Sequence, residues 1–253
     1  MKSSSDSQFE SILSENRLHT LFQPIVNFKD GKTAGFEALS RGPDHTAYFS
    51  PLFLLEEAAQ SGKTRDLDRL FRKNALERAR EQQIAEPLFL NIEPDSIVEF
   101  GRDETEFRSD RRLVLEITER AVHSRRKDLP EAQLRHMRSV GYRLAFDDAG
   151  TGHSSYDRMI QIKPEFIKID AGLIQGIHRD RYRQSLIQSF VLFSRLTGSL
   201  LIAEGIETLS DLETLVRLGV QAGQGYLLGR PERYAVGPRQ NIIRQVRQMS
   251  KLC

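Results

Sequence analysis

The sequence predicts an α/β fold, a TIM-type (β/α)₈ barrel in which one strand near the N-terminus is antiparallel to its neighbours. Three observations lead to this fold class. Short apolar, β-branched runs recur along the chain, amphipathic stretches separate most of them, and 253 residues is about the length that eight such units need. An open, doubly wound sheet is the competing prediction, because it also alternates strands with helices.

Eight runs are predicted strands. The segment 27–34 between the first two is too short for a helical crossover, so these two strands should be antiparallel neighbours. Apolar residues at helical spacing follow later strands, as in 67–79 and 186–193, and favour parallel pairing there. The predicted strands are LFQPIV at 21–26, GFEALS at 35–40, LFLNI at 88–92, LVLEIT at 113–118, RLAFDD at 143–148, FIKID at 166–170, LLIAEGI at 200–206 and VQAGQGYLL at 220–228.

The two ends of the chain differ in character. Residues 1–10 are serine-rich and are predicted to be a flexible tail, and residues 11–253 are predicted to form a single barrel. The segment 239–253 places Ile242, Val246 and Met249 at helical spacing among basic residues. We interpret it as the last barrel helix, packed against its neighbours; contact with an anionic membrane or a partner is the alternative.

Composition excludes several classes of protein. With 37 basic and 35 acidic residues, the net charge of +2 gives no reason to expect binding to a nucleic acid polymer. No apolar stretch reaches the roughly 18 residues of a membrane span, and the N-terminal residues do not resemble a secretory signal. The single cysteine, Cys253, fits a reducing compartment, so a cytoplasmic location is expected.

Polar residues share one face of the predicted strands. Side chains alternate along a strand, so Glu37 lies on the face opposite Phe36 and Ala38. One such residue would simply meet solvent at a strand end, but six strands repeat the arrangement, which favours convergence in the mouth of the barrel lumen. The repeated polar positions are Glu37, Asn91, Glu116, Asp147, Lys168, Asp170 and Glu204.

A cluster of this composition requires cations. Two like charges about 4 Å apart repel by about 4 kcal/mol at an effective dielectric constant of about 20. The candidate ligands are oxygen donors without cysteine or paired histidines, which favours Mg²⁺ or Mn²⁺ over zinc. The adjacent Asp147 and Asp148 end a strand, where Asp147 can bridge two ions and Asp148 can turn towards the second. The following GTGHSS at 150–155 lacks the lysine of a P-loop and is interpreted as a loop that shapes the metal site.

Nine segments between about residue 18 and residue 234 resemble the EAL-domain family, the cyclic di-GMP phosphodiesterases of bacterial signalling. They occur in the order of the family: FQPIV, EALSR, LDRL, FLNIEP, LEITE, FDDAGTGHSS, FIKID, AEGIE and GQGYLLGRP. The resemblance implies a barrel that hydrolyses cyclic di-GMP to linear pGpG with two ions, Mg²⁺ or Mn²⁺. It also implies a homodimer formed through helices near the loop after the fifth strand.

The resemblance further implies roles for individual residues. Lys168 would position the attacking water and stabilise the developing charge, and the metal ligand Glu37 would also belong to the catalytic residues. Glu119 and Glu207 would support the site, Glu119 by anchoring the loop after Asp148 and Glu207 from behind the seventh strand. One ion would be bound by Glu37, Asn91, Glu116 and Asp147, and the second by Asp147, Asp148 and Glu204. The substrate would be contacted by Gln23, Leu39, Arg41, Asp68, Asp170, Gln224 and Pro231, with Arg41 on a phosphate.

Three residues depart from the usual pattern of this family. Ala149 replaces the phenylalanine after the paired aspartates, Glu93 replaces a serine, and Leu70 replaces a frequent tryptophan. None of the three is an implied metal ligand, so an active enzyme is the primary interpretation. The alternative is a catalytically weak or inactive domain that acts as a cyclic di-GMP receptor or as a protein-interaction module.

Overall fold

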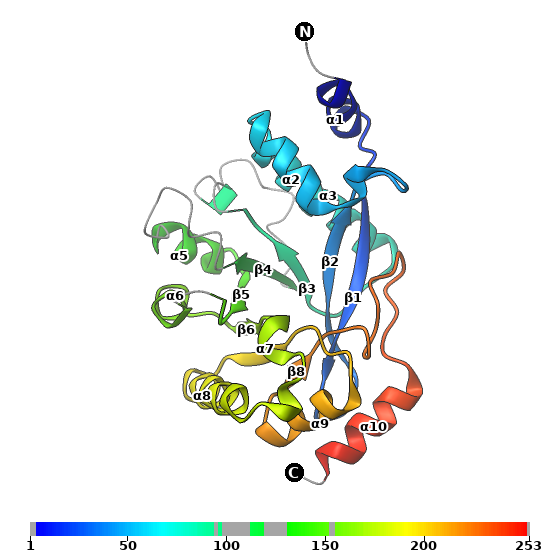
Figure 1. The fold of residues 1–253 in the computed structure, drawn as a ribbon. Coiled ribbons are helices and arrows are strands. Elements are labelled where there is room, and N and C mark those ends of the chain that lie inside the picture. Colours follow the sequence, from blue (N-terminus) through cyan, green and yellow to red (C-terminus); the bar gives the residue numbers. More distant parts are fainter. Residues whose placement is uncertain (1–3, 94–95, 98–111, 119–130, 152–154, 252–253) are drawn as a thin grey trace.

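Eight strands form a closed barrel in the order β1 to β8 in the computed structural model, which describes residues 4–93, 96–97, 112–118, 131–151 and 155–251 (Figure 1). The strands are β1 (His19–Asn27), β2 (Thr33–Arg41), β3 (Leu88–Asn91), β4 (Leu113–Thr118), β5 (Arg143–Ala149), β6 (Phe166–Ile169), β7 (Leu200–Ala203) and β8 (Ala222–Gly223). This closure confirms the predicted barrel and excludes the open sheet.

Strand β1 is the reversed strand. It pairs antiparallel with both β2 and β8, whereas the neighbours from β2 to β8 pair in parallel. The turn between β1 and β2 is closed by hydrogen bonds from Gly31 N to Asn27 O and from Asn27 N to Lys32 O, both 2.8 Å long. The predicted antiparallel pair is therefore confirmed, because a turn this short can only reverse the chain.

Helices cover the outer face of the barrel (Figure 1). The strand residues on this face form one buried cluster with helix residues; Leu90, Phe146 and Ile167 are examples, each at most 2% exposed. The predicted apolar faces therefore pack against helices. The helices are α1 (Ser4–Ser14), α2 (Pro51–Gln60), α3 (Thr64–Glu81), α5 (Glu131–Ser139), α6 (Ser155–Ile162), α7 (Ala171–Ile174), α8 (Arg181–Thr197), α9 (Leu209–Leu218) and α10 (Gln240–Ser250), with 3₁₀ turns η1 (Ala47–Phe49) and η4 (Ile177–Arg179).

A second apolar cluster fills the lumen below the site. Phe89 of β3 and Val114 of β4 belong to it, and the residue two positions later on each strand, Asn91 or Glu116, is polar. The period of two therefore places a polar layer directly above an apolar one. The lumenal cluster consists of Ile25, Phe89, Val114, Ala145, Ile202 and Ala222.

The N-terminal residues contradict the predicted flexible tail. Residues 4–10 belong to α1, and Phe9 and Ile12 are buried in a cluster with Tyr48 and Leu54. Phe9 and Ile12 are an apolar pair at helical spacing within this serine-rich segment. Burying a large apolar side chain contributes about 1.5–3 kcal/mol, which is enough to hold a short helix against α2.

Helix α10 confirms the interpretation of the C-terminal segment as a packed helix. Ile242 and Val246 are buried in the main apolar cluster, and α10 contacts α9. Among the described residues, no helix combines the length and the apolar character that crossing a bilayer requires.

Candidate active site

The ammonium group of Lys168 lies among four carboxylates in the barrel mouth. Its Nζ is 2.7 Å from Oε1 of Glu116 and 2.7 Å from Oε1 of Glu204. The same atom is 3.3 Å from Oδ1 of Asp147 and 3.5 Å from Oε2 of Glu37. Lys168 is 1% exposed and Glu116 is completely buried. The sequence-predicted convergence of these strand-end residues is therefore present in the structure.

Burial dominates the protonation of this cluster. It raises the pKa of Glu116 well above its usual value, raises the pKa of Asp147, and raises the pKa of Glu204 to about 8. Burial alone would lower the pKa of Lys168, but the surrounding carboxylates raise it well above its usual value. Without a further cation, part of the cluster therefore holds protons at neutral pH, because one ammonium cannot offset the negative charges around it.

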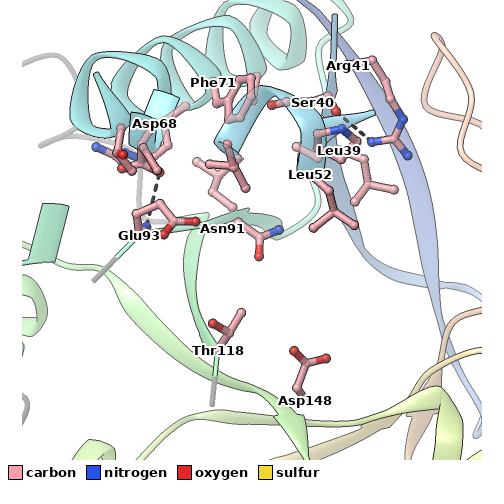
Figure 2. A pocket seen from close by; sticks show the side chains of 18 residues that line it. Leu39, Ser40, Arg41, Leu52, Asp68, Phe71, Asn91, Glu93, Thr118 and Asp148 are labelled. Carbon is pink, nitrogen blue, oxygen red and sulfur yellow. Dashed lines mark hydrogen bonds and ion pairs between the residues drawn. The ribbon is translucent and has the colours of Figure 1, made fainter. Parts of the chain in front are cut away.

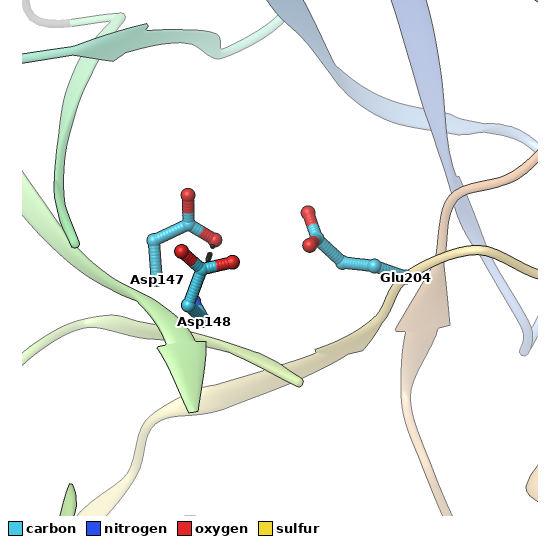
Figure 3. Close-up of side chains that lie close together, drawn as sticks. All are labelled: Asp147, Asp148 and Glu204. Carbon is cyan, nitrogen blue, oxygen red and sulfur yellow. Dashed lines mark hydrogen bonds between the residues drawn. The ribbon is translucent and has the colours of Figure 1, made fainter. Parts of the chain in front are cut away.

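A β-bulge brings Asp147 and Asp148 to the same site. Phe146 pairs with Ile167 and Ala149 pairs with Ile169, so two aspartates stand opposite the single residue between those partners. Asp148 has a φ of 58°, a left-handed conformation that aspartate adopts more readily than most residues. Regular alternation would direct the two side chains to opposite faces; the bulge directs both towards the mouth, where they face Glu204 (Figure 3).

Amide side chains complete the polar layer around Glu37. Gln224 Nε2 donates to Glu37 Oε2 at 2.5 Å and to Gln23 Oε1 at 2.8 Å. Asn91 Nδ2 lies 3.5 Å from Glu37 Oε1. The segment after β8 that carries Gln224 packs closely against the segment after β7. Gly225 permits this packing, because a Cβ at this residue would lie 2.2 Å from backbone atoms of Ile206.

The donor set fits divalent cations that prefer oxygen ligands. Oxygen atoms of Asp147, Asp148 and Glu204 lie within 4.8 Å of one another. Both carboxylate oxygens of Glu116 are buried, and the Lys168 ammonium, 2.7 Å from Oε1, is the cation that the described residues place beside them. Buried carboxylates of this kind are satisfied by cations, and an all-oxygen set suits Mg²⁺, Mn²⁺ or Ca²⁺.

Two adjacent cavities open at this site. The smaller, of about 410 Å³, lies over the carboxylate cluster. The larger, of about 580 Å³, lies between the strand ends and helices α2 and α3 (Figure 2). Leu39 and Asp148 line both cavities, so the larger one is continuous with the candidate metal site. Together they can hold a ligand much larger than a single phosphate.

Some of the remaining predicted residues line one of the two cavities and others do not. Glu207 lines the smaller cavity itself, whereas Arg41 and Asp68 line the larger one. Asp170 caps α7 by accepting a hydrogen bond from Gly172 N at 2.8 Å, and neither Asp170 nor Pro231 is among the described residues that line the two cavities. Their substrate contacts stay predictions. Glu119 lies outside the described residues.

Several cavity residues were not predicted from the sequence. Leu52 and Leu55 of α2, Phe71 of α3 and Thr118 at the end of β4 line the larger cavity, and Tyr226 lines the smaller one. Three of these residues come from helices, so the alternation within strands could not reveal them. The sequence feature that could have indicated these cavity walls is the number of aromatic and apolar residues in segment 51–71, between the second and third strands.

The family of the chain follows from its sequence match. The family model of the EAL domain matches residues 6–231, which is most of the chain, so this protein belongs to the EAL domain family. The cyclic di-GMP phosphodiesterase RocR of Pseudomonas aeruginosa is 29% identical over 232 residues, which cover 87% of this chain and 58% of that protein. The cyclic di-GMP phosphodiesterase PdeF of Escherichia coli is 25% identical over 235 residues, and this chain spans 31% of its length.

Solved structures of similar proteins share the barrel. The PaMucR phosphodiesterase in complex with c-di-GMP is 25% identical, with a TM-score of 0.77, over 89% of this chain and 96% of that chain. BlrP1 of Klebsiella pneumoniae, in a calcium and cyclic di-GMP complex, is 27% identical, with a TM-score of 0.78, over 88% of this chain and 57% of that chain. A manganese complex of BlrP1 is 26% identical with a TM-score of 0.76, over 85% of this chain and 56% of that chain.

Proposed function

We propose that this chain is a metal-dependent phosphodiesterase that hydrolyses cyclic di-GMP to linear pGpG. One observation carries the proposal: Lys168, the paired aspartates on the β5 bulge, and Glu204 meet at the floor of a cavity large enough for a dinucleotide. The names of RocR and PdeF support the same activity. We expect a cytoplasmic location, because a cyclic dinucleotide of this kind is an intracellular signal.

The carboxylates provide ligands for two Mg²⁺ or Mn²⁺ ions. When bound, such ions ionise a water molecule and neutralise charge on the phosphate. Asp147 would be the common ligand, because it lies around Lys168 together with Glu37 and Glu116 and is also close to Asp148 and Glu204. The proposed ligands are Glu37, Asn91, Glu116 and Asp147 for one ion, and Asp147, Asp148 and Glu204 for the other.

Residues of the chain position the reacting groups. Lys168 keeps its positive charge at neutral pH and can orient the attacking water and offset charge that develops on phosphate oxygens. Arg41 lines the larger cavity, and its planar guanidinium suits two phosphate oxygens. Gln224 holds Glu37 by a hydrogen bond and so fixes the orientation of that carboxylate.

We also propose that the chain forms a homodimer through α6 and α8. These helices follow β5 and η4, and they carry large apolar side chains that are between 37% and 79% exposed. Exposed apolar surface of this kind is typical of protein–protein contacts. The residues concerned are Tyr156, Ile160, Leu186, Leu192 and Leu196.

The activity is tested by incubating the purified chain with cyclic di-GMP and Mg²⁺ or Mn²⁺ and following pGpG by chromatography. We expect product that depends on the added ion and is abolished by a chelator. Binding of intact cyclic di-GMP without product would contradict the enzyme and support a receptor. Neither binding nor product would contradict both.

A further inference from the structure

The larger cavity has ends of opposite charge. Arg41 lies at one end and Asp68 and Glu93 lie at the other, as Figure 2 shows. Leu52 and Phe71 lie between these two ends and form apolar walls of the cavity (Figure 2). A cation at one end suits a phosphate, and apolar walls suit the faces of a base. Acids at the other end suit the N–H groups on the edge of that base.

The backbone holds Glu93 at this end. Ile92 N donates to Glu116 O at 3.1 Å, and Glu93 N donates to Asp68 Oδ1 at 3.3 Å. The carbonyl of Glu93 accepts from Ser96 N at 2.9 Å. These bonds anchor the residue on both sides, so its side chain projects from a fixed point at the end of β3.

The two acids differ in their surroundings. Asp68 forms an ion pair with Arg72, and both side chains are at most 4% exposed, so that buried pair balances its own charge. Glu93 is half-buried and lines the cavity, with its carboxylate directed towards Asn91 in Figure 2. Glu93 is the more exposed of the two acids, so it is the one that an incoming ligand can reach.

A carboxylate distinguishes between purines. It only accepts hydrogen bonds, and its two oxygens suit two adjacent N–H donors. Guanine offers such a pair in N1–H and its 2-amino group, whereas adenine presents an acceptor at N1, which a carboxylate repels. The serine that the family usually has here has one short hydroxyl and cannot make this pair of contacts.

We propose that Glu93 is a specificity-determining residue that selects guanine in the larger cavity by accepting hydrogen bonds from N1–H and the 2-amino group. This inference rests on the proposed function, because it concerns the base of the same substrate. It assigns a role to a residue that departs from the usual family pattern and that is neither a metal ligand nor a phosphate contact.

The test is a cycle of two protein forms and two substrates. The wild type and Glu93→Gln are each assayed with cyclic di-GMP and with cyclic di-IMP, which lacks only the 2-amino groups. Because a hydrogen bond to a charged group contributes substantially, we expect the wild type to favour cyclic di-GMP by about 10-fold or more in kcat/KM. In Glu93→Gln this preference should fall to within about threefold of unity, mostly through KM, with the metal requirement unchanged.

Two controls separate specificity from general damage. Glu77→Gln changes an exposed acid of α3, 52% exposed, and should keep the wild-type preference. Glu93→Ala removes both acceptors and should lose the preference as well, so the result does not depend on the glutamine amide. Binding of both ligands is also measured by calorimetry with a chelator present, where no turnover is expected.

The outcomes distinguish this inference from the proposed function. Hydrolysis of cyclic di-GMP with an unchanged preference in Glu93→Gln and Glu93→Ala would overturn the role of Glu93 and leave the enzyme intact. Binding without hydrolysis would contradict the enzyme, while the ratio of the two Kd values would still decide the role of Glu93. Neither binding nor hydrolysis by the wild type would overturn both.

Discussion

Lys168→Met removes the cation that lies among the four carboxylates while keeping most of the side-chain length. The ammonium lies 2.7 Å from two carboxylates, and each such contact corresponds to about 6 kcal/mol of attraction at an effective dielectric constant of about 20. Repulsion among the acids and their raised pKa values offset most of this attraction. We therefore expect a net loss of about 3–5 kcal/mol, the usual cost of breaking a buried ion pair.

Thermal unfolding with and without Mn²⁺ measures this effect. In chelator, the Met variant should unfold about 6–20 °C below the wild type, given about 2–4 °C per kcal/mol for a domain of this size. Mn²⁺ should raise the Tm of the variant more than that of the wild type, because no internal cation competes for the carboxylates. Turnover should fall by about 100-fold or more. Lys73→Met, at a side chain that is 46% exposed, is the matched control and should change stability by at most about 0.5 kcal/mol. An unchanged Tm for Lys168→Met in chelator, or normal turnover, would refute this reasoning.

Three further predictions follow from the structure. Burial raises the pKa of Glu204 to about 8, so Mn²⁺ binding at pH 7 should release a proton. The apparent affinity for Mn²⁺ should therefore rise by up to about tenfold per pH unit from pH 6 to 8. Calorimetry in two buffers of different ionisation enthalpy tests this, and binding without proton release would contradict it. Burial alone would raise the pKa of Asp211, but hydrogen bonds from His178, from the Thr208 hydroxyl and from backbone N–H groups lower it. An acid whose pKa is lowered in the folded state stabilises the fold above its unfolded pKa of about 4, and this contribution is lost as the pH falls through the folded pKa. Asp211→Asn should therefore cost about 1–3 kcal/mol at pH 7 and flatten the dependence of stability on pH below about 4. Equal acid unfolding curves for the two proteins would argue against this. Leu196→Glu, at a side chain that is 79% exposed, should halve the mass measured by light scattering and keep the barrel, and a wild-type monomer at micromolar concentration would count against the dimer.

Much of the site could be predicted from the sequence because strand geometry is regular. The period of two separates Glu116 from Leu115 and Ile117 whatever the details of packing, and the order of parallel strands brings such residues to one end of the barrel. The short link before the second strand likewise left only an antiparallel pair. These features depend on local chain geometry, which the sequence encodes directly.

Other features depend on contacts between distant segments. Phe9 and Ile12 form part of the core only because η1 and α2 supply the surface against which they pack, so the serine-rich start gave a misleading prediction of a flexible tail. The apolar walls at Leu52 and Phe71 come from helices whose rotation is set by tertiary packing. The cap that Asp170 forms on α7 is different, because it is a local contact with Gly172 N two residues later.

The most direct test of the central claim is the initial rate of pGpG formation as a function of Mn²⁺ concentration, for the wild type and for Asp147→Asn. The wild-type rate should vanish in chelator, rise with Mn²⁺ and saturate, because we propose that the carboxylate cluster binds the ions that the reaction requires. Asp147→Asn should be at least about 100-fold slower at saturating cyclic di-GMP, since it weakens the ligand that we propose for both ions. A rate that is insensitive to the chelator, or an Asp147→Asn variant as fast as the wild type, would contradict the account.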